Sequence, residues 1–414
     1  MVEIHKKVNS FRRNLLIFFC LITFVSLCLS PFIPIKSNFF IRLEDLILPF
    51  ILILLIPEFK LLKNWYFIII FSWAGYGVLS MAINGRLGFI NDYFELYKLF
   101  KYVAFIILFY IFFKLNLNVY KLVALVLLIL ILFNLLHYYN IFHFNEVVMP
   151  SFATNKAQLD FFGKNSLGGQ ATKRIIGTMG NPNINGILFS FFSIYFIRFI
   201  KMEKWHWGKL FFFLSISMIL LSQSRTCMLA LGAYILCFVI MEKVNLKTIL
   251  KLLFGIIVSI VLVKMMDENS LGYLTKAKFN ISENGSLRGR LEAWTELWGM
   301  IKEKPIFGYG INKNYFYSHK LYSENEYILM AWRYGVIGLF FYLATLIAPL
   351  RYMKGWKLIH TEKSTFFVLL LLLFTINALT NNPFSNPVLQ LLFAIGVAYY
   401  LSQFNLNEKK TRNA

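Results

Sequence analysis

Long apolar runs broken by short charged segments dominate the sequence. Twelve of these runs come close to the roughly 17 to 25 residues that a helix needs to cross a bilayer. They lie at 15–30, 41–56, 65–83, 99–113, 121–139, 184–200, 209–222, 226–241, 246–265, 326–348, 365–380 and 388–402. Each run predicts a transmembrane helix, because it offers no polar face to water. The expected fold class is therefore an all-α integral membrane protein, a single polytopic domain over residues 1–414.

Lysine and arginine gather in alternate short loops. With the N-terminus inside, the inside segments are 1–14, 57–64, 114–121, 198–209, 242–251, 349–363 and 403–414. These segments hold 22 of the 42 basic residues and 6 of the 20 acidic ones. Basic loops close to a span tend to stay in the cytoplasm, so both termini are expected there. The first run follows four basic residues but no small-residue cleavage site follows it, which indicates a retained first span.

Composition supports the membrane assignment. The chain is 58% hydrophobic and 15% charged, whereas soluble domains are about half apolar and a quarter charged. The net charge of +22 would suggest nucleic acid in a soluble protein, but here topology accounts for most of it, and no nucleic-acid partner is expected. The four cysteines lie inside apolar runs without disulfide or zinc spacing. No metal or other cofactor is predicted.

Two predicted outer segments, 140–183 and 266–325, are too long to be turns, and loops of that length are usually functional. The second is nearly neutral, with seven acidic and eight basic residues. Its centre repeats large apolar side chains at spacings of three, four and seven residues: Leu291, Trp294, Leu297, Trp298 and Ile301. This pattern predicts an amphipathic helix at the bilayer interface, acting as a lid on the outer face. An ordinary surface helix is the alternative.

Two arginines are notable for their positions. Arg225 ends the turn SQSR in a stretch otherwise without charge, at the predicted outer edge of the membrane, and Arg290 begins the loop helix. Such a side chain can simply extend to the lipid headgroups. It can also bind phosphate, because a guanidinium matches phosphate oxygens in pairs and charges near the membrane are costly to keep. Arg225 and Arg290 facing each other would suit a diphosphate.

Six short motifs, taken in order, resemble the O-antigen ligase and Wzy-type polymerase superfamily of bacterial polysaccharide assembly. They are GTMGNPN at 177–183, SQSR at 222–225, SLRGR at 286–290 with Trp294, PIFGYG at 305–310, ENEY at 324–327 and RYGVIG at 333–338. Each is weak alone. Their order, and their placement around a long outer loop between the ninth and tenth spans, make the resemblance fairly specific over about residues 176 to 340.

The resemblance implies a multi-pass glycosyltransferase of the bacterial inner membrane that needs neither metal nor nucleotide sugar. Its donor would be an oligosaccharide on undecaprenyl diphosphate and its acceptor another glycan, with a chain-length regulator as a further partner. The catalytic residues would be Arg225, Arg290 and Glu324. Substrate binding would fall to Arg288, Asn325, Lys173, Arg174, Asn183, Gly308 and Gly310. Simpler explanations stay open: Lys173 and Arg174 can be solvated loop residues, and Asn181 to Asn183 can form a helix cap.

One departure bears on the choice within the superfamily. Ligases, which transfer finished glycan to lipid A core, resemble one another in a His-Asn pair at the end of the long loop. This chain has Glu324 and Asn325 there, which favours a polymerase. A ligase remains the alternative, with His319 as a weaker candidate for the missing histidine. A flippase for lipid-linked oligosaccharide is the third possibility, although the chain shows no internal repeat of the kind typical of transporters.

Overall fold

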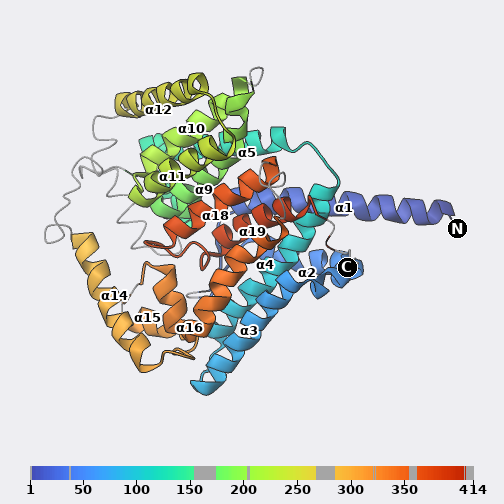
Figure 1. Ribbon diagram of the computed structural model, residues 1–414, viewed down its shortest axis with the longest axis vertical. Helices are drawn as coiled ribbons and strands as arrows, with labels where there is room; N and C mark the ends of the chain where they lie inside the picture. Colours follow the sequence, from blue (N-terminus) through green and yellow to red (C-terminus); the bar gives the residue numbers. More distant parts are fainter. Residues whose placement is uncertain are drawn as a thin grey trace.

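The computed structural model describes residues 2–36, 39–152, 174–202, 206–266, 285–319, 321, 323–353, 361–404 and 406, and its architecture is helical (Figure 1). Twelve helices coincide with the twelve apolar runs: α1 (Val2–Leu29), α2 (Leu43–Leu55), α3 (Trp65–Ile83), α4 (Ile90–Lys114), α5 (Tyr120–Tyr139), α9 (Pro182–Ile197), α10 (His206–Ser222), α11 (Arg225–Met241), α12 (Leu246–Met266), α16 (Glu326–Ile347), α18 (Glu362–Asn377) and α19 (Pro387–Leu401). The predicted helical fold is confirmed.

Further elements join these helices. On the predicted outer side they include α6 (Phe144–Val147), α14 (Gly285–Glu303) and α15 (Lys313–His319). The 3-10 helices are η1 (Ile56–Lys63), η2 (Ile141–His143), η3 (Met149–Ser151), η5 (Gly177–Met179), η6 (Arg198–Lys201) and η8 (Ala348–Tyr352). Strands β1 (Ile33–Lys36) and β2 (Phe39–Ile41) pair antiparallel between α1 and α2, which the apolar pattern does not predict.

Within the described residues, seven helices are long and apolar enough to cross a membrane. They are Ser10–Leu29 of α1, α3, α4, α5, α9 with η6, α12, and α16 with η8. Three further apolar helices, α10, α11 and α19, are shorter. The structure thus supports a membrane protein, and the count of twelve spans stays a prediction.

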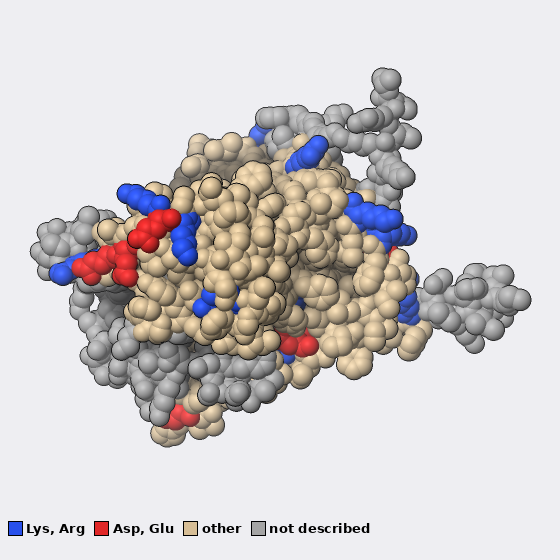
Figure 2. Space-filling view, turned by 90° about the horizontal axis from the view of Figure 1, so that it is seen from below, with Lys and Arg blue, Asp and Glu red and all other residues tan. Residues whose placement is uncertain are grey.

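One face of the molecule carries a broad area with few charged side chains. In Figure 2 most of the visible lysine, arginine, aspartate and glutamate side chains lie toward the left and right margins, with a wide area of other residues between them. Large apolar side chains such as Phe50, Leu229 and Phe254 are more than half exposed. Exposed apolar surface of this extent is a liability in water. It is the surface expected against lipid.

The predicted inside loops contact one another at one end of the helices. Arg12 pairs with Glu58 at 3.1 Å, and Lys201 pairs with Glu242 at 2.9 Å. In Figure 1, α1 begins at the right of the view, whereas α14 and α15, from the long predicted outer loop, lie at the left. The alternation of inside and outside loops stays a prediction.

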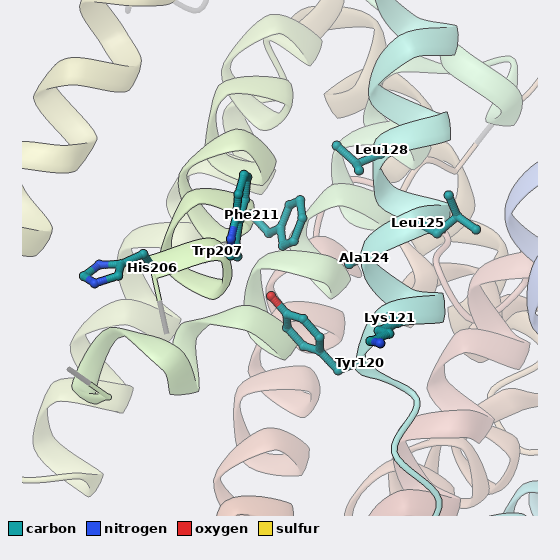
Figure 3. Close-up of a pocket in the computed structure, with 8 residues that line it drawn as sticks. All are labelled: Tyr120, Lys121, Ala124, Leu125, Leu128, His206, Trp207 and Phe211. Carbon is teal, nitrogen blue, oxygen red and sulfur yellow. The ribbon is translucent and has the colours of Figure 1, made fainter. Parts of the chain in front are cut away.

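A groove at the predicted inside end lies between the first turns of α5 and α10 (Figure 3). Tyr120 and Lys121 line it from α5, and His206 and Trp207 line it from α10. The Trp207 side chain is 68% exposed. Tryptophan and tyrosine next to cationic groups are typical of the interface between lipid and water. This groove is thus consistent with the membrane boundary lying at the start of both helices.

A break in α16 links the long outer loop to the helical bundle. The backbone leaves the helical conformation at Gly335, where φ is 65° and ψ is −169°. The loop after α14 docks at this break: the Val336 amide donates to the Pro305 carbonyl at 2.8 Å, and the Tyr309 amide donates to the Trp332 carbonyl at 2.9 Å. Two motifs that are separate in the sequence, 305–310 and 333–338, therefore meet in space.

We predict that Gly335→Ala destabilises the protein. An added Cβ would collide with the Ile306 backbone, and this region of backbone space costs a non-glycine residue about 1–3 kcal/mol. The midpoint of thermal unfolding in detergent should fall by several degrees. Gly232→Ala is the matched control, because a Cβ there meets open space. Equal midpoints for the two variants would contradict the docking role of the break.

Candidate active site

The turn between α10 and α11 holds Arg225 at the predicted outer ends of these helices. Ser222, Gln223 and Ser224 are buried, and Arg225 is exposed as the first residue of α11. Gln223 has a φ of 49°, in the left-handed region that non-glycine residues seldom adopt. The tight turn places the arginine at the end of a helix and not along its side.

Arg174 lies beside the same turn. Its Nε donates to the Ser222 carbonyl at 2.9 Å, and a terminal guanidinium nitrogen donates to Oδ1 of Asn183 at 2.9 Å. The Asn181 side chain caps α9 by accepting from the Asn183 amide at 2.9 Å, which confirms the predicted cap. Two residues predicted to bind substrate, Arg174 and Asn183, thus neighbour Arg225. Lys173 lies outside the described residues.

The hairpin between α18 and α19 contacts this turn. The hydroxyl oxygens of Thr226 and Thr380 are 2.5 Å apart, and the Cys227 thiol donates to Oδ1 of Asn377 at 3.3 Å. The hairpin therefore packs against the start of α11.

The other side of the hairpin contacts the start of α16. Asn325 caps this helix by accepting from the Ile328 amide at 3.1 Å, and its Nδ2 donates to the Leu379 carbonyl at 3.1 Å. Asn325 is 8% exposed, and both ends of its amide group are engaged within the protein. Its predicted contact with substrate stays a prediction.

Arg290 and Glu324 form an ion pair at the edge of this arrangement. Their side chains are 24% and 48% exposed, so the pair lies at the surface and is accessible. Glu324 has a φ of 38°, and unfavourable backbone of this kind often accompanies functional positions. Next to the pair, the Trp294 indole donates to the Ser323 carbonyl.

Arg225 and Arg290 are therefore joined by a short series of contacts. Thr226, next to Arg225, contacts Thr380. Leu379 accepts from Asn325, whose neighbour Glu324 pairs with Arg290. The structure connects all three predicted catalytic residues through a single hairpin.

α14 packs on α16 through one narrow stripe. Ala293, Leu297 and Ile301 are buried against residues that include Leu329 and Trp332. The predicted helix is confirmed, but its large apolar residues divide between two sides. Leu291 and Trp298 are 37% and 53% exposed, the position that contact with the bilayer interface requires. The predicted lid role stays a prediction.

Arg288 is placed on the exposed side of α14. It pairs with Glu292 at 2.8 Å, and this hydrogen bond raises the pKa of the Arg288 guanidinium. Residues two positions apart on a helix point about 200° away from each other, so Arg288 does not share the side of Arg290. The structure does not bring Arg288 to Glu324.

Gly308 and Gly310 belong to the loop docked on α16. Both are buried with φ values of 64° and 72°, and the Gly308 carbonyl accepts from Asn84 at 3.1 Å. The adjacent Tyr309 stacks on Trp332 and donates to Glu303 at 2.7 Å. Partial burial, together with this hydrogen bond, raises the pKa of Tyr309 to about 12. These contacts explain why the loop needs glycines. The predicted role of Gly308 and Gly310 in substrate binding stays a prediction.

His319 lies at the end of α15. Its ring stacks on Tyr315, with the ring centroids 4.0 Å apart, and its Nδ1 lies 2.9 Å from the Ser318 hydroxyl. These contacts involve its own short helix. They do not join it to the hairpin that connects Arg225 and Glu324.

A group of buried ionisable residues, which the apolar pattern did not predict, lies between α4, α16 and the hairpin. The Glu326 carboxylate is fully buried and accepts from the amides of Phe384 and Ser385, each at 2.6 Å. Lys98 donates to the Ser385 carbonyl at 2.7 Å and pairs with Glu95, which also pairs with Arg333. The sequence does contain a signal for this group, namely charged residues at the ends of apolar runs or within them. A charged side chain in a membrane costs free energy and usually has a charged or polar partner.

Comparison with known proteins agrees with the motifs. Residues 210–343 match the sequence model of a family described as O-antigen ligase. The match confirms the resemblance to the O-antigen ligase and Wzy-type polymerase superfamily, and it includes Arg225, Arg290 and Glu324. It supports an enzyme of the membrane glycosyltransferase kind. No curated protein matches the chain.

We predict that Glu326→Gln loosens the hairpin. The glutamine amide presents an N–H group where the carboxylate accepts from two backbone amides, and an unsatisfied buried donor costs about 1–3 kcal/mol. The unfolding midpoint in detergent should fall. Glu292→Gln is the control, because Glu292 is exposed and pairs only across one turn of α14. An unchanged midpoint for Glu326→Gln would show that the carboxylate does not hold the hairpin.

Proposed function

We propose that this protein joins oligosaccharide repeat units carried on undecaprenyl diphosphate into O-antigen or capsular polysaccharide. The reaction would take place on the outer face of the bacterial inner membrane. The observation that carries the proposal is the accessible Arg290–Glu324 pair, which one hairpin connects to Arg225 within the stretch that matches the family. A cationic pair and a carboxylate are the groups that this transfer needs.

The chemistry assigns a role to each group. An acceptor hydroxyl oxygen attacks the anomeric carbon of the donor, and the bond from that carbon to the phosphate oxygen breaks with its electron pair leaving on the diphosphate. Arg225 and Arg290 stabilise the developing negative charge, because fixed guanidinium donors bind phosphate oxygens strongly. Glu324 accepts the proton of the attacking hydroxyl, once the diphosphate has taken its place beside Arg290.

The lid explains how water is kept away. α14 is fixed to α16 by its buried stripe and by the docked loop at residues 305–310, while Leu291 and Trp298 remain exposed. With these two side chains in the bilayer interface, the helix would cover the reacting groups. Excluding water protects an activated glycosyl donor from hydrolysis.

A ligase is the second candidate, and the family description itself favours it. In a ligase the donor would carry the finished polymer, and the acceptor would be lipid A core or another molecule. The polymerase is preferred because Glu324 stands where ligases of this superfamily have histidine. His319 contacts its own helix and not the hairpin.

We also propose twelve spans with both termini in the cytoplasm. All twelve apolar runs form helices, and pairs such as Arg12–Glu58 and Lys201–Glu242 join predicted inside loops to each other. A chain-length regulator in the same membrane is the protein partner that this function requires.

The orientation can be tested with single cysteines and a thiol reagent that does not cross the membrane. Lys302→Cys, on the exposed side of α14, should react in intact spheroplasts, and Lys247→Cys, at the start of α12, should react only after lysis. The reverse pattern would invert the proposed orientation.

We predict that Arg225→Ala and Arg290→Ala abolish polymer formation while the protein remains in the membrane. Each variant would be expressed in a strain that lacks the gene, and its surface glycan would be separated on a gel. A polymerase without its diphosphate clamp should leave single repeat units, with at least a tenfold loss of long chains, in line with the loss of a strong electrostatic contact.

Lys302→Ala is the matched control for this experiment, because it removes a cation from the exposed side of the same helix. Long chains at normal abundance in both arginine variants would overturn the clamp. Full-length polymer that accumulates on its lipid carrier would instead identify the protein as a ligase. Arg290→Lys keeps the positive charge but removes the paired donors, since lysine cannot bind two phosphate oxygens in parallel. This variant therefore tests whether charge alone is enough.

A further inference from the structure

A deep cavity lies at the opposite end of the helices from the candidate active site. Its volume is about 310 Å³, and it is bounded by α1, α4, α5, α9, α18 and α19. The inner lining consists mainly of phenylalanine and other apolar side chains, among them Phe24, Phe109, Phe112, Phe191 and Phe366. Such a lining offers few partners to a sugar or a nucleotide, and it suits a hydrocarbon chain.

The cavity extends well into the bundle from its mouth. Arg198 and Glu362 mark the mouth, and Phe191 lies seven residues earlier on α9 than Arg198. At 1.5 Å per helical residue this separation corresponds to about 10 Å. The depth is that of a substantial part of one acyl chain, and the mouth lies at the level where a lipid headgroup begins.

The mouth carries more positive than negative charge. Arg198 pairs with Glu362 and lies over the Tyr195 ring at 4.4 Å. Lys363 donates to the Ser402 hydroxyl at 2.7 Å, and none of the carboxylates in the described part of the chain lies within ion-pair distance of it. Burial and the neighbouring Lys114 lower the pKa of Lys363. Arg198 and Lys363 therefore line the mouth together with the carboxylate of Glu362. Lys114 lies close enough to Lys363 to lower its pKa and adds a third cation nearby.

We propose that this cavity binds an anionic phospholipid of the adjacent leaflet, with one acyl chain among the phenylalanines and the phosphate at Lys363 and Lys114. In the orientation proposed above this is the cytoplasmic leaflet. Basic pockets between helices on that side are suited to anionic headgroups. The phosphate would pair with Lys363, which has no carboxylate partner among the residues that the structure describes, and the acyl chain would fill an apolar space that water occupies poorly.

The test uses the full chain purified in detergent. Its unfolding midpoint is measured with phosphatidylglycerol, with phosphatidylcholine of the same acyl chains, and with inorganic phosphate. Specific binding stabilises the folded state in proportion to the logarithm of ligand concentration. We expect phosphatidylglycerol to raise the midpoint by roughly 3 °C or more, and we expect phosphatidylcholine and inorganic phosphate to have little effect.

Variants identify the site. Lys363→Gln combined with Lys114→Gln should remove at least half of the rise, measured against the variant's own midpoint without lipid. Leu21→Phe, which adds volume to the lining, should reduce it as well. Lys247→Gln is the control for an exposed lysine at the same end of the helices. A full rise in the double lysine variant, equal rises with both lipids, or a rise with phosphate alone would each overturn the proposal.

Discussion

The Glu326 carboxylate is fully buried where α16 meets the hairpin between α18 and α19, and the arrangement of the candidate site depends on its contacts there. A buried carboxyl group needs hydrogen-bond donors within the protein, and the backbone amides of Phe384 and Ser385 in the closed hairpin supply them. Closure fixes Leu379 and Thr380, which contact Asn325 and Thr226 respectively. One acidic side chain thereby sets the relative position of two helix ends, those that carry Glu324 and Arg225.

A bilayer tolerates irregular backbone only where the freed polar groups find partners within the protein. The break at Gly335 meets this condition, because the docked loop at residues 305–310 supplies both a donor and an acceptor. α3 secures the same loop from the other side: the Ser80 hydroxyl donates to the Phe307 carbonyl at 2.6 Å, and the Tyr76 hydroxyl donates to the Ile306 carbonyl at 2.6 Å. The loop that follows α14 is thus attached through hydrogen bonds that also satisfy the backbone groups freed by the break in α16.

The helices could be predicted from the sequence. Whether an apolar run forms a helix depends mainly on the composition of the run itself. The Asn181 cap is local in the same sense, since its partners lie two and three residues away. The contact between Thr226 and Thr380 joins residues 154 positions apart, and no local pattern reports it. The pairing of Arg290 with Glu324 likewise could not be predicted, because it depends on how α14 packs on α16.

The ion pair between Arg290 and Glu324 places a competing anion at the proposed phosphate site. Any anion that binds Arg290 has to displace a carboxylate already tethered next to it, and a tethered group acts at a high effective concentration. A small monovalent anion from the medium would gain a contact with Arg290, but it would have to break the contact between Arg290 and Glu324. The free energy lost is about equal to the free energy gained. A diphosphate that reaches Arg225 as well would gain a second contact. The Glu324 carboxylate pairs with Arg290 and does not compete for that second contact. If the site acts as proposed, it would therefore favour ligands that span both arginines, and it would discriminate by valency as well as by shape.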